Sequence, residues 1–358
     1  MSKIISIGTA VPSYCHLQMD ILSFMQVVYA SSEAEKRRMR FLYSQSGIKQ
    51  RYSVIPDYSR TVHDWKFYPQ TENLEPFPSL EQRMTLYNRQ APLLSVDAIR
   101  NCLHSVHNHK DVTHLITVSC TGMSAPGLDL QVMELMDFGK NIFRTSVNFM
   151  GCYAAIHALK IGDAICRTDK AAQVLIVCTE LCTLHFQREA TIDNITSSLL
   201  FGDGAAALLM THADTYRPGL TIDGFYSEII TKGKRDMAWE LSSSGFLMTL
   251  SGYVPDLIEE DFLAVVKRAM GEESLESISH WCMHPGGKRI LEAIATSTGV
   301  DRKAFHHSYH VLQQYGNMSS ASIVFVLKEI LQQKIPVPKL FSAAFGPGLT
   351  VETFTAHS

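Results

Sequence analysis

The stretch Phe149-Met-Gly-Cys-Tyr-Ala-Ala155 connects a predicted strand over 145–149 to a predicted apolar helix over 154–164. Gly151 permits a sharp turn there and a close approach by a substrate. Cys152 is therefore expected at the N-terminus of the helix, where the helix dipole and free N–H groups favour a thiolate and lower its pKa. Cys152 is a candidate nucleophile, and a small cysteine packed in a buried helix is the alternative.

Strands and helices alternate on both sides of this turn, and the C-terminal part repeats the rhythm of the first part. Such alternation indicates α/β layering built from one strand–helix unit that is used twice. A duplicated unit brings two helix N-termini together, so that one carries a nucleophile and the other its partners. Beyond the two elements above, strands are expected over 114–119, 174–179, 279–283, 340–344 and 350–355 and after the turn at 202–204, and helices over 81–108, 128–136, 288–295 and 322–331.

The least regular part of the chain covers residues 53–80, which are rich in Pro, Tyr and Trp. It shows neither helical nor strand periodicity. We therefore expect a long surface excursion there.

The composition is that of an ordinary globular protein, with 358 residues, 46% hydrophobic and 19% charged. A net charge of −3 gives no reason to expect nucleic acid as a partner. The N-terminus does not resemble a signal peptide, and no apolar run reaches the ~18 residues of a membrane span. The eight cysteines are scattered and form no CxxC pair, which favours a reduced, cytoplasmic protein.

Several of the fifteen histidines have the spacing of a helical metal pair, namely His280 with His284 and His306 with His310. No carboxylate or cysteine completes a ligand set beside them. We therefore expect no metal site.

Two later segments resemble the setting of Cys152. Met283-His-Pro-Gly-Gly287 ends a predicted strand and opens a helix, and the proline and glycines would hold the His284 imidazole forward. Gly316-Asn-Met-Ser-Ser320 is a loop before another helix. A lone histidine or asparagine is more often a core or capping residue. A cysteine, a later histidine and a later asparagine, each at such a junction, form a much rarer set and point to nucleophilic catalysis.

These residues also carry a family resemblance. The strings Phe149-Met-Gly-Cys152, Phe201-Gly-Asp-Gly204, His284-Pro-Gly-Gly287, Tyr315-Gly-Asn-Met-Ser-Ser-Ala321 and Phe345-Gly-Pro-Gly-Leu-Thr-Val-Glu352 resemble the motifs of type III polyketide synthases, the chalcone and stilbene synthase family. They stand in the family's order and near its spacing, from about Ile4 to Thr355. A fatty-acid ketoacyl synthase III shares the fold and the Cys/His/Asn set of catalytic residues, but it lacks the Gly-Asn-Met-Ser-Ser string.

The resemblance implies an α/β fold, the thiolase-like αβαβα five-layered sandwich of two duplicated halves, 1–215 with the nucleophile and 216–358 with the histidine and asparagine. It implies a homodimer that uses malonyl-CoA and an acyl-CoA or acyl carrier protein thioester. Cys152 would accept the starter acyl group, while His284 and Asn317 would stabilise the enolate left by malonyl decarboxylation. An imidazolium at His284 would also pair with the Cys152 thiolate. No metal or nicotinamide cofactor is needed.

The resemblance also suggests the residues that contact the substrate. Phe201 matches the family's aromatic gate, Met248 replaces a second gate aromatic, and Ala125 stands where chalcone-forming members carry a bulky Met. Basic residues for coenzyme A are only partly kept on an early helix, at 36–40. The other expected substrate-binding residues are Cys120, Thr121, Cys182, His185, Trp239 and Ser319.

The small residues favour a long acyl starter, since an apolar chain gains roughly 0.8 kcal/mol for each buried CH₂. Trp239 would narrow the chamber in which the chain cyclises, as in the alkylresorcinol-forming branch of the family. The sequence resembles the bacterial long-chain alkylresorcinol and alkylpyrone synthases. The expected product is an alkylresorcinol. An alkylpyrone or other short polyketide, a ketoacyl synthase III-like reaction and a non-catalytic acyl-binding homologue are the alternatives. A peripheral membrane contact through a lipid product stays open.

Overall fold

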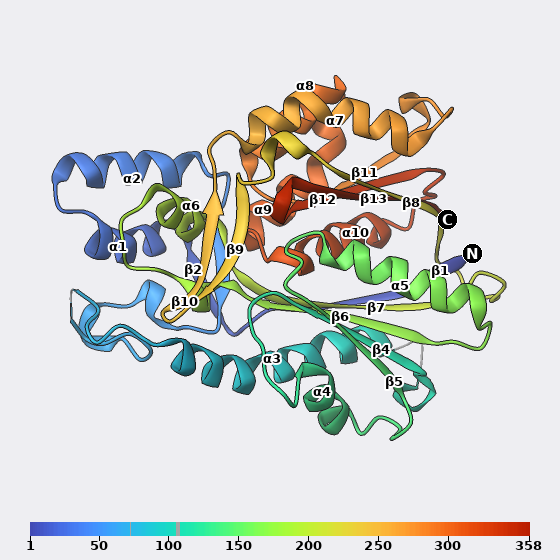
Figure 1. Ribbon diagram of the computed structural model, residues 1–358, viewed down its shortest axis with the longest axis horizontal. Helices are drawn as coiled ribbons and strands as arrows, with labels where there is room; N and C mark the ends of the chain where they lie inside the picture. The colour runs from blue at the N-terminus through green and yellow to red at the C-terminus, as the bar shows by residue number, and fades with distance from the viewer. Residues whose placement is uncertain (72, 105–107) are drawn as a thin grey trace.

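The computed structural model describes residues 1–71, 73–104 and 108–358. Five layers are stacked in Figure 1: helices α3 and α4, a lower sheet, helices α5 and α10, an upper sheet, and helices α7 and α8. The fold is the thiolase-like αβαβα sandwich that was expected. Short antiparallel pairing of β1 with β8, at Lys3–Thr221 and Ile4–Leu220, joins the two sheets into one nine-stranded order, β11-β12-β13-β8-β1-β7-β6-β4-β5.

The lower sheet comes from the N-terminal part of the chain. Strand β6 lies between parallel β4 and antiparallel β7, and β5 forms the edge. The predicted strands and helices all occur here, with bounds shifted by a few residues, and helix α3 ends before residues 105–107, which lie outside the described part. The elements are β1 (Ser2–Ala10), α3 (Leu80–Leu103), β4 (His114–Ser119), α4 (Leu128–Met136), β5 (Phe143–Asn148), α5 (Ala154–Thr168), β6 (Val174–Leu181) and β7 (Asp203–His212).

The upper sheet comes from the C-terminal part. Strand β12 pairs in parallel with β11 and antiparallel with β13, which in turn pairs with β8. The predicted C-terminal strands and helices are present, and strand β8 and helices α7 and α9 are elements that were not predicted. The elements are β8 (Leu220–Ile229), α7 (Val254–Met270), β11 (His280–Met283), α8 (Lys288–Thr298), α9 (His306–Tyr315), α10 (Ser322–Gln332), β12 (Leu340–Gly346) and β13 (Thr350–His357).

A group of smaller elements lies at one end of the sandwich, at the left of Figure 1. It contains helices on the outside and two short antiparallel pairs, β2 with β3 and β9 with β10. The hairpin β9–β10 is a sheet of its own, separate from the nine-stranded sheet. The elements are β2 (Tyr14–Leu17), α1 (Gln18–Tyr29), α2 (Glu33–Gln45), β3 (Gln50–Ser53), α6 (Ile192–Leu200), β9 (Met237–Ser242) and β10 (Gly245–Leu250).

Between strand β3 and helix α3 the described residues form only short 3₁₀ turns and many are exposed, as a surface excursion would be. The segment is irregular, but Tyr58, Trp65 and Tyr68 are buried and pack around Phe24 of α1 at centroid distances of 4.9–5.5 Å. Asp57 stabilises the segment by accepting backbone N–H groups from residues 66–68. These aromatic side chains thus form a small core although the segment has no helical or strand periodicity. Large rings can be buried without a regular element.

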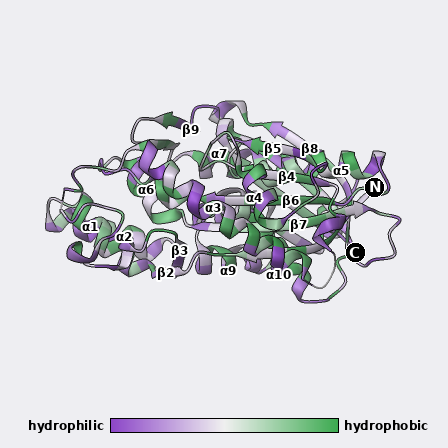
Figure 2. Ribbon diagram, turned by 90° about the horizontal axis from the view of Figure 1, so that it is seen from below, coloured by the Kyte–Doolittle hydropathy of each residue, from purple (hydrophilic) through white to green (hydrophobic). Residues whose placement is uncertain are grey.

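The middle helices α5 and α10 are covered by sheets on both faces and are strongly apolar. Outer helices mix hydrophobic and hydrophilic residues, as the colouring of Figure 2 shows. Among the described residues, no helix combines the length and hydrophobicity that a membrane crossing requires.

Candidate active site

Cys152 lies at the turn that the sequence predicted, two residues before helix α5. Phe149 and Gly151 both have positive φ, 59° and 79°, so the chain reverses sharply between β5 and α5. A Cβ on Gly151 would lie 2.2 Å from Cδ of Pro347, which excludes any side chain there. The turn therefore requires glycine next to the nucleophile.

His284 follows strand β11, and its backbone N–H donates to the Ala343 carbonyl oxygen at 2.9 Å. The side chain is only 2% exposed, and neither Nδ1 nor Nε2 has a hydrogen-bond partner. A buried ring nitrogen without a partner is costly unless a ligand supplies one. The imidazole is therefore available to a substrate.

Asn317 follows helix α9, which ends at Gly316 with φ of 68°. Its Oδ1 accepts the Ser319 backbone N–H at 2.8 Å, and its Nδ2 donates to the Gly286 carbonyl oxygen at 3.2 Å. These bonds fix the orientation of the amide. The Cys152 Sγ lies 4.0 Å from the same Oδ1, so the two side chains meet although 165 residues separate them.

All three side chains open into one cavity of about 570 Å³. Hydrophobic side chains and small residues form most of its wall. Its lining reaches the surface at the exposed Phe41 of helix α2 and the exposed Arg289 at the start of helix α8, and this part of the lining is here called the mouth. Of the substrate-binding residues expected from the sequence, the cavity is lined by Cys120, Thr121, Cys182, Phe201, Trp239, Met248 and Ser319.

No hydrogen bond joins Cys152 to His284 in this structure, because neither ring nitrogen of His284 has a partner. Burial raises the pKa of the Cys152 thiol to about 12, aided by the Glu180 carboxylate and opposed by hydrogen bonds with Ser319 and Asn317. Burial alone lowers the pKa of His284 to about 3. Burial in the apolar cavity thus acts against both charged forms and against the effect of the helix N-terminus, and the thiolate–imidazolium pair stays a prediction.

His185 does not line this cavity. Its Nε2–H donates to the Thr121 carbonyl oxygen at 2.7 Å, and its Nδ1 accepts the Phe246 backbone N–H at 3.1 Å. Both ring nitrogens are occupied within the protein, although the side chain lines a second, smaller chamber that adjoins the cavity. Its predicted contact with the substrate stays a prediction. The side chain connects strand β10 to the cavity wall, and its ring stacks on Phe246 at 4.1 Å.

Ala125 is also outside the cavity lining of its own chain. It lies in the exposed loop between β4 and α4 and forms a cis peptide bond with Pro126. Ala125 is therefore not among the lining residues of the cavity in this chain, and its predicted contact with the substrate stays a prediction. Counting residues along the chain does not show which way a loop turns.

Comparison with known proteins agrees with this geometry over almost the whole chain. The profile of the chalcone and stilbene synthase N-terminal domain matches residues 1–214, and that of the C-terminal domain matches residues 221–358. The chain belongs to the chalcone and stilbene synthase family. It is thus a type III polyketide synthase, an enzyme of the acyltransferase class.

One curated relative of this family, "Probable polyketide synthase 1" of Dictyostelium discoideum, is 27% identical over 365 residues. That match covers 98% of this chain but only 11% of the relative. Among solved structures, the C-terminal type III polyketide synthase domain of "Steely1" from Dictyostelium has 25% identity and a TM-score of 0.92, covering 100% of this chain and 99% of the other. PKS-I of the brown alga Ectocarpus siliculosus has the same fold, with 24% identity, a TM-score of 0.93 and coverage of 100% and 98%.

A carboxylate that was not predicted from the sequence lies near Cys152 in this polyketide synthase. Glu180 is fully buried, and its oxygens accept from the Cys120 N–H at 3.0 Å, the Thr121 hydroxyl at 2.9 Å and the Ser320 hydroxyl at 2.5 Å. Burial raises its pKa to about 7. The sequence offered one signal for Glu180: it is the single acidic residue in the mostly apolar segment that forms the buried strand β6.

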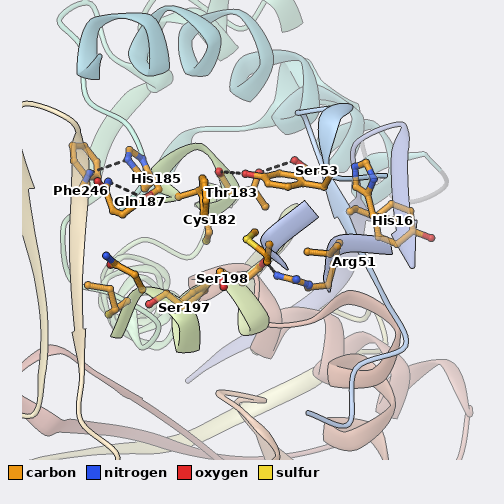
Figure 3. A pocket seen from close by; sticks show the side chains of 18 of the residues that line it. His16, Arg51, Ser53, Cys182, Thr183, His185, Gln187, Ser197, Ser198 and Phe246 are labelled. Carbon is orange, nitrogen blue, oxygen red and sulfur yellow. Dashed lines mark hydrogen bonds between the residues drawn. The ribbon is translucent and has the colours of Figure 1, made fainter. Parts of the chain in front are cut away.

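A second, narrower chamber of about 50 Å³ adjoins the main cavity. Figure 3 shows its lining, with Cys182 and His185 on one side and His16 and Arg51 on the other. The two spaces share four lining residues, namely Cys182, Phe201, Trp239 and Met248.

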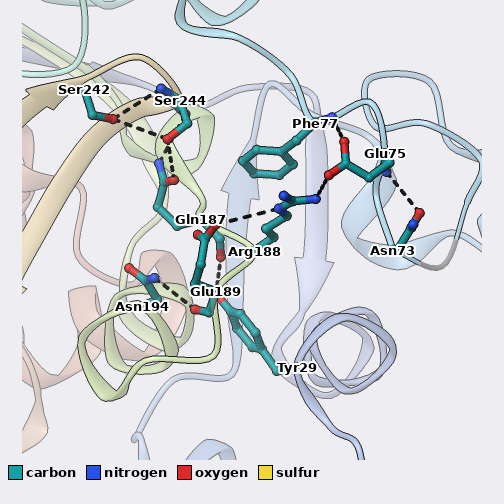
Figure 4. Close-up of polar contacts among 10 residues, drawn as sticks. All are labelled: Tyr29, Asn73, Glu75, Phe77, Gln187, Arg188, Glu189, Asn194, Ser242 and Ser244. Carbon is teal, nitrogen blue, oxygen red and sulfur yellow. Dashed lines mark hydrogen bonds and ion pairs between the residues drawn. The ribbon is translucent and has the colours of Figure 1, made fainter.

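The hairpin β9–β10 is held over the cavity by polar contacts with the loop after His185 (Figure 4). The Ser244 hydroxyl donates to Gln187 Oε1 at 3.1 Å, and the Tyr29 hydroxyl donates to the Gln187 carbonyl oxygen at 2.5 Å. Arg188 forms an ion pair with Glu75 of the irregular segment. These contacts position Trp239, which the hairpin carries.

Within the described residues, no group of three potential ligands is placed to hold a metal ion. Of the histidines with the spacing of a metal pair, His310 lies 2.7 Å from the Glu329 carboxylate through its Nδ1, whereas the His306 Nδ1 lies 2.9 Å from the Lys303 carbonyl oxygen.

Proposed function

We propose that this type III polyketide synthase condenses a fatty acyl thioester with malonyl-CoA by decarboxylative Claisen condensation and cyclises the product to an alkylresorcinol. The observation that carries the proposal is the convergence of Cys152, His284 and Asn317 on one apolar cavity. Their order along the chain and their junction positions match the family's motifs.

Acyl loading begins with the neutral pair that burial favours. His284 takes the Cys152 proton as Sγ attacks the thioester carbonyl carbon, and the coenzyme A or carrier-protein thiol leaves with a proton. Because the unpartnered imidazole nitrogens face the cavity, the ring accepts this proton without first losing another hydrogen bond.

Chain extension needs stabilisation of negative charge on an oxygen. The bond between the malonyl carboxylate and its α-carbon breaks, CO₂ leaves, and the electron pair forms an enolate. The Asn317 Nδ2 carries a hydrogen that the Gly286 carbonyl does not use, and His284 supplies a second donor. The enolate carbon then attacks the acyl-Cys152 carbonyl, and the thiolate leaves.

A long apolar starter is supported by the shape of the cavity. The wall is mainly apolar or small, and the second chamber lies directly past Cys182 and Phe201. Each CH₂ of a chain that enters this space gains roughly 0.8 kcal/mol. The exposed arginines 37, 38 and 40 lie on α2 just before Phe41 at the mouth, where the phosphates of coenzyme A would find cations.

Alkylresorcinol formation is supported by Trp239, which lies on the chamber wall. Its Nε1–H donates to the Cys120 carbonyl oxygen at 2.7 Å, so the indole is rigid. A rigid ring excludes extended conformers of the polyketide chain, and these are the conformers that release early as pyrones.

The proposal includes the cellular setting and the assembly. We place the enzyme in the cytoplasm as a homodimer, with residues 1–215 and 216–358 as its two catalytic halves. The exposed Ala125 would then be available to the cavity of a partner subunit. Release of a lipid product through the mouth would bring the enzyme into contact with a membrane surface.

Product analysis by mass spectrometry tests the proposal, using malonyl-CoA with acyl-CoA starters of increasing chain length. Alkylresorcinols from long starters are expected. Release of labelled CO₂ from malonyl-CoA separates an enzyme from a non-catalytic acyl-binding homologue, which would bind the starter without decarboxylation.

A further inference from the structure

The backbone of Asn317 is held by a short segment outside both sheets. The Asn317 N–H donates to the Leu200 carbonyl oxygen, and the Gly202 N–H donates to the Asn317 carbonyl oxygen, both at 2.9 Å. Phe201 and Asn317 thus form an isolated parallel bridge. Any displacement of residues 200–202 therefore moves the asparagine.

Arg51 of strand β3 supports this segment from the opposite side. Its Nη1–H donates to the Phe201 carbonyl oxygen, and its Nε–H donates to Gln18 Oε1 at 2.9 Å. Gln18 in turn donates to the Leu199 carbonyl oxygen at 2.9 Å. Arg51 also packs against Gly316, where an added Cβ would lie 2.7 Å from the Arg51 Cδ.

Burying the charged Arg51 side chain costs free energy and needs an explanation. The side chain is 4% exposed, and burial lowers the pKa of its guanidinium. The neighbouring Asp203 carboxylate is engaged elsewhere, with Thr183 and the backbone N–H of Val54. A buried cation that bonds carbonyl and amide oxygens instead of a carboxylate contributes little to stability.

We propose that Arg51 is a positioning residue that holds the 200–202 segment, and through it Asn317, in the geometry for malonyl decarboxylation. This inference rests on the proposed role of Asn317. The planar guanidinium places two donors in a fixed fork, one on Gln18 and one on Phe201. A lysine keeps the charge but cannot make both bonds, so the fork and not the charge is the required feature. Figure 3 shows the Arg51 side chain extending toward Ser198 of the neighbouring helix α6.

The chain offers a matched control in Arg83. It is also fully buried, and its Nε donates to the Pro78 carbonyl oxygen at 3.1 Å and its Nη1 to the Leu184 carbonyl oxygen. Each arginine has an Nη2 without a partner. Within the described part of the chain, the hydrogen bonds of Arg83 go to Pro78 and Leu184 and not to residues 199–202 or 317, so Arg83→Lys loses comparable bonds without releasing the asparagine.

The test measures labelled CO₂ release from malonyl-CoA alone, per folded enzyme, for wild type, Arg51→Lys and Arg83→Lys. Arg51→Lys is expected to lower kcat by between about tenfold and a hundredfold, the scale of an ångström misplacement, with KM nearly unchanged. Arg83→Lys is expected to stay within about threefold of wild type. Iodoacetamide labelling of Cys152 should proceed equally in all three.

A second variant keeps the test decisive if Arg51→Lys does not fold. Gln18→Met removes the acceptor for Arg51 Nε and the donor to Leu199, and it should lower kcat in the same direction. Equal kcat in Arg51→Lys and Arg83→Lys, or a loss confined to KM, would overturn the inference. A wild type without decarboxylation would instead overturn the proposed function.

Discussion

Trp239 is the residue whose replacement should most directly change the product. It stands on strand β9 opposite Met248, donates its indole N–H to the Cys120 carbonyl oxygen at 2.7 Å, and packs edge-on against His185 and Phe246 at 5.6 and 5.8 Å. Two changes separate its functions. Trp239→Phe removes the hydrogen bond and keeps most of the ring, whereas Trp239→Gly removes the wall.

The sizes of the two effects follow from these contacts. Loss of one hydrogen bond is worth about 1 kcal/mol, so Trp239→Phe should change the ratio of resorcinol to pyrone by at most about fivefold. Trp239→Gly also admits extended chain conformers, and a tenfold shift in product ratio needs only ~1.4 kcal/mol between competing barriers. We expect at least about a tenfold shift toward alkylpyrones, with total turnover within about tenfold of wild type.

Liquid chromatography of products from one fatty acyl-CoA starter measures the ratio. Trp281→Phe is the control, because Trp281 is 4% exposed and packs on Phe305 and Phe341 within the C-terminal half. It should leave the product ratio unchanged. A wild type that makes only pyrones, or a Trp239→Gly ratio equal to that of wild type, would refute the steering role of the indole.

The remaining predictions concern the nucleophile, the enolate and the starter. Cys152→Ala should abolish acyl loading and leave the fold intact, and an acylated variant in intact-mass spectra would exclude Cys152 as the nucleophile. Asn317→Ala should lower malonyl decarboxylation by about 10²–10³, the scale of one oxyanion donor, and a full rate would remove that role. The Cys152 thiol has a raised pKa, about 12, and only the thiolate reacts with iodoacetamide. Labelling of the free enzyme should therefore rise about tenfold per pH unit from pH 6 to 9. A plateau near pH 6–7 would instead reveal an ion pair with His284. Cys182→Phe should close the passage between the two chambers. Long starters should then lose about 0.8 kcal/mol of binding free energy for each excluded CH₂, a factor of about four in kcat/KM. Equal losses for short and long starters would place the acyl chain elsewhere.

The sequence by itself predicted the chemistry of the catalytic residues. Gly151 before Cys152, the prolyl and glycyl residues after His284, and the loop at Asn317 are local features, and local backbone rules apply to them directly. The alternation of strands and helices likewise predicted the layers, because periodicity depends on near neighbours. Those expectations survive in the structure.

Only the tertiary structure decided the environments of the side chains. Burial by residues from both halves raises the pKa of Cys152 and lowers that of His284, and a local pattern does not reveal this effect. The loop direction that exposes Ala125 and the two bonds that occupy His185 are likewise set by packing.

The same reason explains the contacts that were not predicted. Glu180 meets Ser320 across 140 positions, Trp239 meets Cys120 across 119, and Arg51 meets Phe201 across 150. Local patterns carry no information about such contacts, because each depends on how the duplicated halves and the end group of helices are packed. The sequence therefore predicted which groups are candidates for the reaction, and the tertiary structure decided how they are oriented and enclosed.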